Sequence, residues 1–290
     1  MLPWRRIGVA LKGGQTEVGP LIARVAARVE AHGLELVLDP EAAAALPGTP
    51  PEEAPKLEEL PSRCDLLVVL GGDGTVLAAA RAIGERDVAI LGINLGQLGF
   101  LADIARDDLE SALASVLSGR YCIQERARLQ VTHDRVAGGC ERDLVLNDAV
   151  ITKGSALARL IELEARVDER LIASYRSDGL ILSTPTGSTA YNLSAGGPLV
   201  DPRLPALILS PICPHTLTQR PLVLPDSLRV EVRLHSREDA TLTLDGQIGV
   251  PLRCGDRLQV TRSAHPLRFV TLSPHDPFAT LRGKLGWGAR

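Results

Sequence analysis

Three polar segments interrupt the apolar stretches of this chain, and each carries residue types that could do chemistry. The first is the run GGDGT at residues 71–75, which directly follows five apolar residues at 66–70. Glycines between a strand and a helix let backbone N–H groups approach an anion, and the helix N-terminus favours that anion. Asp73 alone would repel phosphate, so we expect it to take a proton from an attacking hydroxyl or to reach phosphate through a cation. A tight turn with Asp73 as helix N-cap is the competing interpretation.

The second segment spans residues 177–198 and contains a short apolar strand at 180–182. Hydroxyl groups and glycines then dominate, and residues 184–200 contain no charged side chain. Such a segment offers neutral donors and acceptors with little bulk, which suits the ribose and base edges of a nucleotide. Runs of Ser, Thr, Gly and Pro are usually surface turns. Surface turns seldom continue so long without a charge, which favours a segment folded into a site.

The third segment is an apolar run at residues 144–151 that has Asn147 and Asp148 at its centre. Adjacent residues of a strand point to opposite faces, so at least one of these two side chains is expected to face the core or a site. An amide can read an adenine edge, and a carboxylate can accept hydrogen bonds from ribose hydroxyls. A β-bulge or an exposed edge strand is the alternative.

Composition and absent motifs exclude several other classes of protein. No G-x-x-x-x-G-K-[ST] loop occurs, and no G-x-G-x-x-G follows the first strand, so neither a P-loop ATPase nor a standard dinucleotide-binding unit is expected. The net charge of -3 provides no basic footprint for nucleic acid, and no apolar run approaches the ~20 residues that span a bilayer. The five cysteines and six histidines are scattered, which predicts reduced structural thiols and no metal site made of protein ligands alone.

The elements that must position these segments fall into two regions. Residues 1–122 alternate strand and helix patterns, which is typical of an α/β domain with a parallel sheet. The tract at 40–62 is periodic in neither sense and is expected to be a surface loop or a weak helix. The strands expected in this region lie at 7–11, 34–38, 66–70 and 88–93, and the helices at about 18–29, from 76 onward and from 109 to Gly119.

Residues 123–270 have a different texture and predict a β-rich antiparallel domain with one wet face. Residues 271–290 are expected to form a tail that returns to the first domain. Short segments of alternating apolar and polar residues carry the β prediction, at 129–132, 160–167, 228–234 and 240–244.

The three segments, in this order, resemble the NAD kinase family, bacterial type. The similarity includes residues 92–101 and 244–247, and it extends along most of the chain. GGDGT alone is a weak signal because lipid kinases share it. The run TPTGSTAY at 184–191 is highly specific. The resemblance implies an NAD kinase/diacylglycerol kinase-like fold, with an α/β N-terminal domain and a β-rich C-terminal domain.

The resemblance also implies an activity, namely ATP-dependent phosphorylation of the 2′-hydroxyl on the adenosine ribose of NAD, which gives NADP. Asp73 matches the residue that acts as general base in the family. Mg²⁺ or another divalent cation would accompany ATP, and NAD is the substrate. A cytoplasmic homo-oligomer, either a dimer or a tetramer, is expected from the family, with no nucleic-acid or membrane partner.

Further positions match the family's nucleotide-binding residues. Asp148 stands where many members have glutamate, and Arg159 follows a loop whose length can vary. Asp178 and Arg176 match positions at the nicotinamide end, and Tyr191 could pack against the base. The full set implied by the resemblance is Gly71, Gly72, Gly74, Thr75, Asn147, Asp148, Arg159, Arg176, Asp178, Thr189, Ala190, Tyr191, Asn192, Ser194 and Gln247.

Two other functions compete with this interpretation. A lipid kinase shares GGDGT, but it predicts an apolar entrance or a membrane-binding surface, which a chain with three Phe, two Trp and three Tyr supports poorly. A catalytically silent NAD-binding regulator is the second, and the intact glycine turn and Asp73 argue against it. Turnover itself would discriminate between them.

Overall fold

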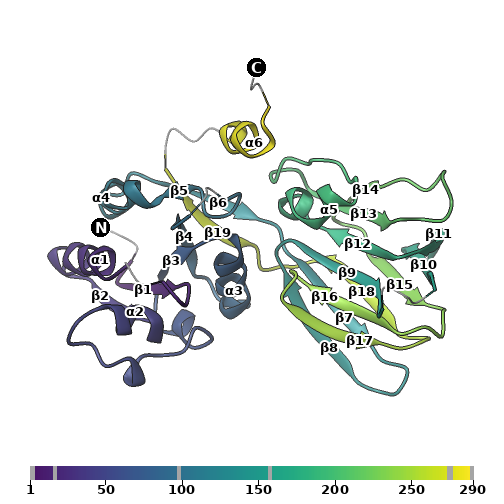
Figure 1. Cartoon of the computed structure of the whole chain (residues 1–290), viewed down its shortest axis with the longest axis horizontal. Helices are drawn as coiled ribbons and strands as arrows, with labels where there is room; N and C mark the ends of the chain where they lie inside the picture. The colour runs from purple at the N-terminus through teal and green to yellow at the C-terminus, as the bar shows by residue number, and fades with distance from the viewer. Residues whose placement is uncertain (1–3, 16–17, 97–98, 156–158, 273–276, 288–290) are drawn as a thin grey trace. The chain divides into compact units, whose positions relative to one another are not determined.

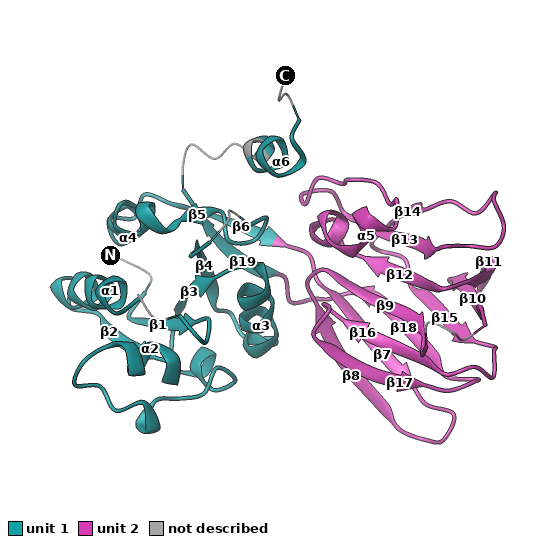
Figure 2. Ribbon diagram, in the orientation of Figure 1, with its two compact units in different colours: residues 1–125, 267–290 teal, residues 126–266 magenta. Residues whose placement is uncertain are grey.

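The chain forms two compact units, coloured teal and magenta in Figure 2. Unit 1 comprises Met1–Glu125 and Leu267–Arg290, and unit 2 comprises Arg126–Pro266. The sequence places the return to the first domain at residue 271, whereas the structure already has β19 (Leu267–Thr271) paired with β4 of unit 1. The computed structural model describes residues 4–15, 18–96, 99–155, 159–272 and 277–287.

Unit 1 is built on one sheet in the order β2-β1-β3-β4-β19-β6, and β5 pairs with β4. The pairs β1/β2, β1/β3, β3/β4 and β4/β19 are parallel, so the α/β prediction is confirmed. Its strands are β1 (Arg6–Leu11), β2 (Glu35–Leu38), β3 (Leu66–Gly71), β4 (Ala89–Asn94), β5 (Ile104–Ala105), β6 (Cys122–Arg126) and β19 (Leu267–Thr271).

Helices cover both faces of this sheet (Figure 1). Apolar residues of α1 and α4 share one core with Val9, Val68 and Leu91, while α3 packs against β3 from the other face. The tract at 40–62 is a short helix and two 3₁₀ turns rather than a plain loop. The helices of unit 1 are α1 (Gly19–Ala31), α2 (Pro40–Ala45), η1 (Pro51–Glu53), η2 (Leu60–Ser62), α3 (Asp73–Ile83), η3 (Arg106–Asp108), α4 (Leu109–Leu117) and α6 (Pro277–Leu285).

Unit 2 contains two antiparallel six-stranded sheets. Sheet B has the order β11-β10-β15-β18-β7-β8, and sheet C has the order β14-β13-β12-β9-β16-β17. The strands of sheet B are β7 (Leu129–Asp134), β8 (Cys140–Val145), β10 (Ile161–Val167), β11 (Arg170–Ser177), β15 (Val230–Leu234) and β18 (Arg257–Arg262). Those of sheet C are β9 (Asp148–Lys153), β12 (Gly179–Ser183), β13 (Ala206–Ile212), β14 (Leu222–Pro225), β16 (Ala240–Leu244) and β17 (Ile248–Leu252).

The two sheets of unit 2 differ in how many of their faces are buried. One core joins them and takes Val131 and Val232 from sheet B with Ile151 and Leu242 from sheet C. Sheet B exposes its other face, as the alternating pattern predicts. The central strands of sheet C are buried on both faces, because its second face packs with Ala195 and the segment containing η4 (Thr186–Thr189) and α5 (Tyr191–Ser194). One wet face therefore describes sheet B and strands β16 and β17 of sheet C, but not the central strands of sheet C.

The cysteines form no disulfide in the described part of the chain. Of the five cysteines only Cys64 is buried, and the other four are exposed. Burial raises the pKa of the Cys64 thiol to about 12. Among the described residues, no helix is both long and apolar enough to cross a bilayer.

Candidate active site

The glycine turn of residues 71–75 lies at the carboxyl end of β3, where a parallel sheet presents its ligands. A Cβ on Gly71 would stand 2.3 Å from Thr75 Oγ1, so the turn requires glycine at this position. Gly72 is the N-cap of α3, and Gly74 is exposed in the first turn of that helix. The helix therefore begins at the motif rather than at residue 76, and it presents a first turn of the kind that favours anions.

Asp73 does not cap its own helix. Its Oδ1 accepts hydrogen bonds from the backbone N–H of Leu101 (3.0 Å) and Ala102 (3.2 Å), and its Oδ2 accepts one from Phe100 (3.0 Å). We call this arrangement the Asp73 clamp. Because Gly72 occupies the N-cap position, the N-cap interpretation of Asp73 is wrong. A loop that follows a different strand fixes the orientation of this carboxylate.

That loop is itself held against the end of the sheet. The amide of Asn94, at the end of β4, donates from Nδ2 to the Ala102 carbonyl (3.3 Å) and accepts from the Gly96 N–H (2.7 Å). A Cβ on Gly99 would lie 1.9 Å from Asp73 Oδ1, so the clamp needs glycine there. The sequence predicted no partner for Asp73, although the glycines at 96 and 99 were a signal of close backbone packing.

Asn147 and Asp148 separate two strands instead of interrupting one, so the prediction of a single strand at 144–151 is wrong. β8 ends at Val145 in sheet B, and β9 begins at Asp148 in sheet C. Leu146 and Asn147 make the bend between the sheets. The chain switches sheets here, and this explains why polar residues follow each other in an otherwise apolar run.

A second carboxylate holds this bend. Asp245 Oδ1 accepts from the N–H of Asn147 (2.7 Å) and Asp148 (3.1 Å), and its Oδ2 accepts from Leu146 (2.9 Å). We call this the Asp245 clamp. Asp245 has a φ of 49° and Gly246 a φ of 66°, which are the backbone angles of a tight Asp-Gly hairpin turn between β16 and β17. Sequence reasoning did not find this role of Asp245.

The start of the hydroxyl-rich segment holds the bend from the other side. Thr184 Oγ1 donates to the Leu146 carbonyl at 2.6 Å, and Ser183 Oγ donates to the Asn147 carbonyl at 3.2 Å. A Cβ on Gly187 would lie 2.1 Å from the same Asn147 carbonyl oxygen. The peptides on both sides of Asn147 are thus fixed by hydrogen bonds and close packing.

The side chains of the predicted pair differ in their surroundings. The Asn147 amide makes no side-chain hydrogen bond with any described residue, so its donors and acceptor are available. Asp148 is buried, and burial raises the pKa of its carboxyl to about 7, with a further contribution from the negative charge of Asp245. At neutral pH this group can therefore either donate or accept a proton in a hydrogen bond.

The hydroxyl-rich segment is partly helical, and its predicted residues divide into two kinds. Tyr191 is 44% exposed and can stack on a planar ligand. Asn192 is fully buried, and its amide is used inside the segment: Nδ2 donates to the Ser188 and Pro198 carbonyls, and Oδ1 accepts from Ser210. The structure thus places the Asn192 side chain as a brace of the segment.

Three further predicted residues lie close to Tyr191 in the same segment. Thr189 ends η4 and donates from Oγ1 to the Thr186 carbonyl at 3.3 Å. Ala190 is half-buried and caps α5, and Ser194 is exposed at the end of that helix. Their small side chains leave the backbone of this segment open to a ligand.

The residues predicted for the nicotinamide end lie at the other end of β9 and β12. Asp178 immediately precedes β12, and its Oδ1 lies 2.7 Å from Lys153 Nζ. The guanidinium of Arg176 is paired with Glu162 at 3.2 Å and is largely exposed. Since Asp148 begins β9 and Lys153 ends it, the two groups of residues stand about 17 Å apart along the strand.

The last two predicted residues are exposed. Arg159 belongs to no helix or strand, and Gln247 follows the Asp245 hairpin turn. The structure therefore brings Asn147, Asp148 and Gln247 together through the Asp245 clamp, whereas no described contact links Arg159 to them.

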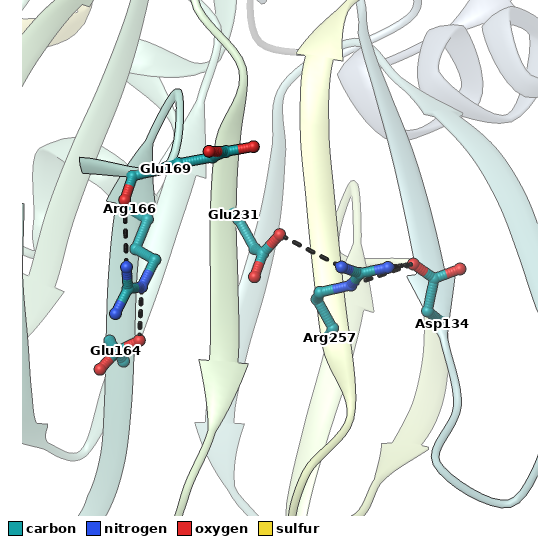
Figure 3. Close-up of polar contacts among 6 residues, drawn as sticks. All are labelled: Asp134, Glu164, Arg166, Glu169, Glu231 and Arg257. Carbon is teal, nitrogen blue, oxygen red and sulfur yellow. Dashed lines mark hydrogen bonds and ion pairs between the residues drawn. The ribbon is translucent and has the colours of Figure 1, made fainter. Parts of the chain in front are cut away.

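A hollow elsewhere in unit 2 has balanced charge and contains none of the predicted site residues. A hollow of ≈ 550 Å³ on sheet B is lined by nine residues, eight of them charged. Figure 3 shows Arg257 paired with Asp134 and Glu231, and Arg166 paired with Glu164. Arginines and acids balance there, so the hollow has no net charge to attract a nucleotide. Among the described residues, no group of three or more His, Cys, Asp or Glu is placed to hold a metal ion.

Two family models match this chain, and their matched ranges contain the predicted motifs. The family model described as ATP-NAD kinase N-terminal domain matches residues 29–121, and the one described as ATP-NAD kinase C-terminal domain matches residues 146–272. The NAD kinase of Geobacter metallireducens is 51% identical over 80% of this chain and 82% of its own length. That of Syntrophotalea carbinolica is 41% identical over 99% of this chain and 100% of its own.

Two solved structures of kinases are similar to this chain along most of its length. Yeast NADH kinase complexed with NADH superposes with a TM-score of 0.89 at 25% identity, over 99% of this chain and 89% of that one. An NAD kinase from Archaeoglobus fulgidus in complex with ATP gives a TM-score of 0.77 at 27% identity, over 97% and 98% of the two chains.

Proposed function

The chain belongs to the ATP-NAD kinase family and is an enzyme that phosphorylates NAD with ATP, and from that premise we propose that Asp73 is its general base. In this role the Asp73 carboxylate takes the proton of the adenosine 2′-hydroxyl as that oxygen attacks the terminal phosphate of ATP. The observation that carries the proposal is the Asp73 clamp at the carboxyl end of β3.

The clamp suits this chemistry because phosphoryl transfer depends mainly on alignment and charge screening. Three hydrogen bonds fix the direction of the carboxylate, so little orientational freedom has to be lost when substrate binds. A carboxylate oxygen that accepts one or two N–H bonds still has electron density for a proton in transit. The exposed Gly74 and the first turn of α3 would bind the phosphates.

Mg²⁺ is proposed to arrive with the phosphates of ATP as part of the substrate. In this proposal the ion is held mostly by phosphate oxygens and water, as Mg²⁺ often is. Gly71, Gly72, Gly74 and Thr75 are proposed to seat the reacting nucleotide groups next to Asp73.

Unit 2 is proposed to hold NAD. The free amide of Asn147 and the carboxyl of Asp148 would take the adenine and its ribose, and Tyr191 would pack on the base. Asp178 and Arg176 would take the nicotinamide end, about 17 Å along β9, a span suited to an extended dinucleotide. The other proposed contacts are Arg159, Thr189, Ala190, Ser194 and Gln247, with Asn192 bracing the segment.

A cytoplasmic location and a dimeric or tetrameric assembly are also part of the proposal, on the basis of the family. Light scattering of the purified protein after gel filtration would measure the assembly, and a monomer at micromolar concentration would contradict it.

The test of Asp73 is the D73N variant, assayed with NAD, ATP and Mg²⁺ and an NADP-specific dehydrogenase as detector. Asparagine keeps two of the three hydrogen bonds at its oxygen but cannot take the proton, so kcat should fall at least about 100-fold while NAD still binds.

Asp65→Asn is the matched control. Asp65 also accepts two backbone N–H bonds in unit 1, from Arg5 and Arg6, but at the start of β3, away from the glycine turn. Its kcat should stay near that of the unmodified enzyme. Near-normal kcat in D73N would remove Asp73 from the mechanism, and no turnover by the unmodified protein would favour a silent NAD-binding protein.

A further inference from the structure

Lys153 and Asp178 form an ion pair that is more enclosed than the arginine pairs of the same unit. Lys153 is the last residue of β9, and Asp178 lies between β11 and β12. Nζ and Oδ1 are 2.7 Å apart, and the side chains are 19% and 33% exposed. An ammonium group that is largely withdrawn from water is stable only with a good partner, so this pair has a defined geometry.

The backbone around the pair is fixed as well. The Lys153 N–H donates to the Asp178 carbonyl at 3.0 Å, and Thr152 pairs with Gly179 across the two strands. A Cβ on Gly179 would lie 2.2 Å from the Ile151 carbonyl oxygen, so glycine allows a close approach of β9 and β12 at this point. The close approach brings the backbone of Lys153 next to that of Asp178.

The pair leaves one carboxylate oxygen unengaged. Lys153 contacts Oδ1, and Oδ2 of Asp178 makes no hydrogen bond with any described residue. Arg176, two residues earlier in the chain, is paired with Glu162 and so does not compete for Asp178. Lys153 is one of four lysines in the chain, in which arginine supplies most of the positive charge, and its ammonium is the cation that faces this acid.

We propose that Lys153 is a positioning residue, which holds Asp178 so that Oδ2 accepts an N–H of the nicotinamide carboxamide. This inference rests on the proposed contact of Asp178 with the nicotinamide end of NAD. Lys153 itself does not touch the dinucleotide. It holds Oδ1 and thereby sets the direction of the other oxygen, so the benefit of the lysine appears only with a ligand that carries the amide donor.

The test compares four variants with the unmodified enzyme on two dinucleotides. The variants are K153M, K153R, D178N and the double variant K153M/D178N. The second dinucleotide is the NAD analogue in which a methyl ketone replaces the carboxamide, because a ketone has no N–H to donate. Both dinucleotides carry the same adenosine end, which is far from the substitution, so kcat and KM are measured for each.

For NAD, K153M and D178N should each raise KM about tenfold, with kcat changed less than about twofold, because a hydrogen bond to a charged group is lost away from the reacting atoms. The double variant should be no worse than D178N alone, since the two residues act through one contact. K153R should keep most of the affinity. For the ketone analogue, K153M should leave KM unchanged.

R257M is the matched control, because Arg257 and Asp134 form a pair of similar length (2.8 Å) in unit 2 on the outer face of sheet B (Figure 3). It should leave KM for both dinucleotides unchanged. If K153M unfolds, Lys153→Leu replaces it, since it also removes both the charge and the donor.

Four results would overturn the inference. An equal KM penalty of K153M on NAD and on the ketone analogue would show a purely structural role for the lysine. Additive penalties in the double variant would show that the two residues act separately. If D178N leaves KM for NAD unchanged, the proposed role of Asp178 is wrong and the inference falls with it, whereas a penalty in D178N without one in K153M removes the inference alone.

Discussion

Asp73 in unit 1 and Asp245 in unit 2 each accept hydrogen bonds from three consecutive backbone amides, at 100–102 and at 146–148. In both clamps Oδ1 accepts two of the bonds and Oδ2 accepts one. The difference lies in the surroundings. Asp73 is half-buried at the first position of a helix, whereas Asp245 is buried in a hairpin turn next to a second acid, Asp148.

The same hydrogen bonds therefore serve two purposes. In unit 1 they orient the carboxylate, which is accessible and proposed to act on substrate. In unit 2 the carboxylate orients the peptides, and the side chains that those peptides carry, Asn147 and Asp148, are the ones proposed to act. One clamp fixes its acid and the other fixes its loop.

The largest expected difference between the two clamps comes from replacing the glycine that packs against each of them. In Gly99→Ala the new Cβ would meet the Asp73 carboxylate, so the acid must leave its three donors and kcat should fall about 100-fold with little loss of stability. In Gly187→Ala the new Cβ would meet the Asn147 carbonyl, which is backbone, so the cost should appear in stability, about 1–3 kcal/mol.

Steady-state kinetics and urea unfolding of both variants measure these outcomes. Gly249→Ala, in β17, is the control for a glycine whose added Cβ makes only an ordinary contact (3.8 Å from Thr241), and it should retain the stability of the unmodified protein. If Gly99→Ala lost stability and kept kcat, the two clamps would serve the same purpose, and the contrast would fail.

A smaller effect is expected from Asp245→Asn. The amide keeps two of the hydrogen bonds and turns its NH₂ toward the remaining N–H, so the bend at residues 146–148 loosens. Asp73, the proposed general base, is unchanged in this variant. KM for NAD should rise about tenfold with kcat within a few-fold of the unmodified enzyme. A kcat loss as large as that of D73N would argue against the division of roles.

The smallest expected effect is on the pH dependence of stability, and it comes from Asp148, which lies beside the Asp245 clamp. The pKa of Asp148 is about 7 in the folded protein and near 4 in an unfolded chain, so between these values the folded state binds the proton more tightly. Stability must then fall as pH rises through this window, by about 1 kcal/mol between pH 6 and pH 8 from this group.

D148N should remove that part of the pH dependence, as measured by urea unfolding at both pH values. Asp39 in unit 1, whose pKa burial raises to about 6, contributes a loss of the same sign in both proteins and so cancels in the difference. Identical pH slopes for D148N and the unmodified protein would show that Asp148 is not the group responsible.

Sequence patterns located the GGDGT turn and the Asn147-Asp148 pair better than they located the groups that form hydrogen bonds with them. The buried strand before GGDGT is seen as β3 within one residue of its predicted end, because five apolar residues followed by glycine admit few alternatives. The partner of Asp73 is a set of backbone N–H groups at 100–102. Every residue type except proline carries such a group, so no side-chain pattern could point to it.

The run at 144–151 shows the limit from another side. Apolar alternation reports burial, and both β8 near its end and β9 are buried, so two strands in different sheets look like one. What separates them is Asp245, about one hundred residues later in the chain. Asn192 was predicted from resemblance as a ligand contact, and only the structure shows that its amide is engaged within the segment.

The position of β19 in the chain has a consequence for how the protein is made. β19 pairs with β4 in the sheet of unit 1, yet it is synthesised after all of Arg126–Pro266. Unit 2 is one continuous stretch and can close its two sheets as soon as it leaves the ribosome. Unit 1 has to wait for its late strand, so the half with the glycine turn is the last to finish folding, and a chain cut short before residue 267 would contain a complete unit 2 beside an open sheet.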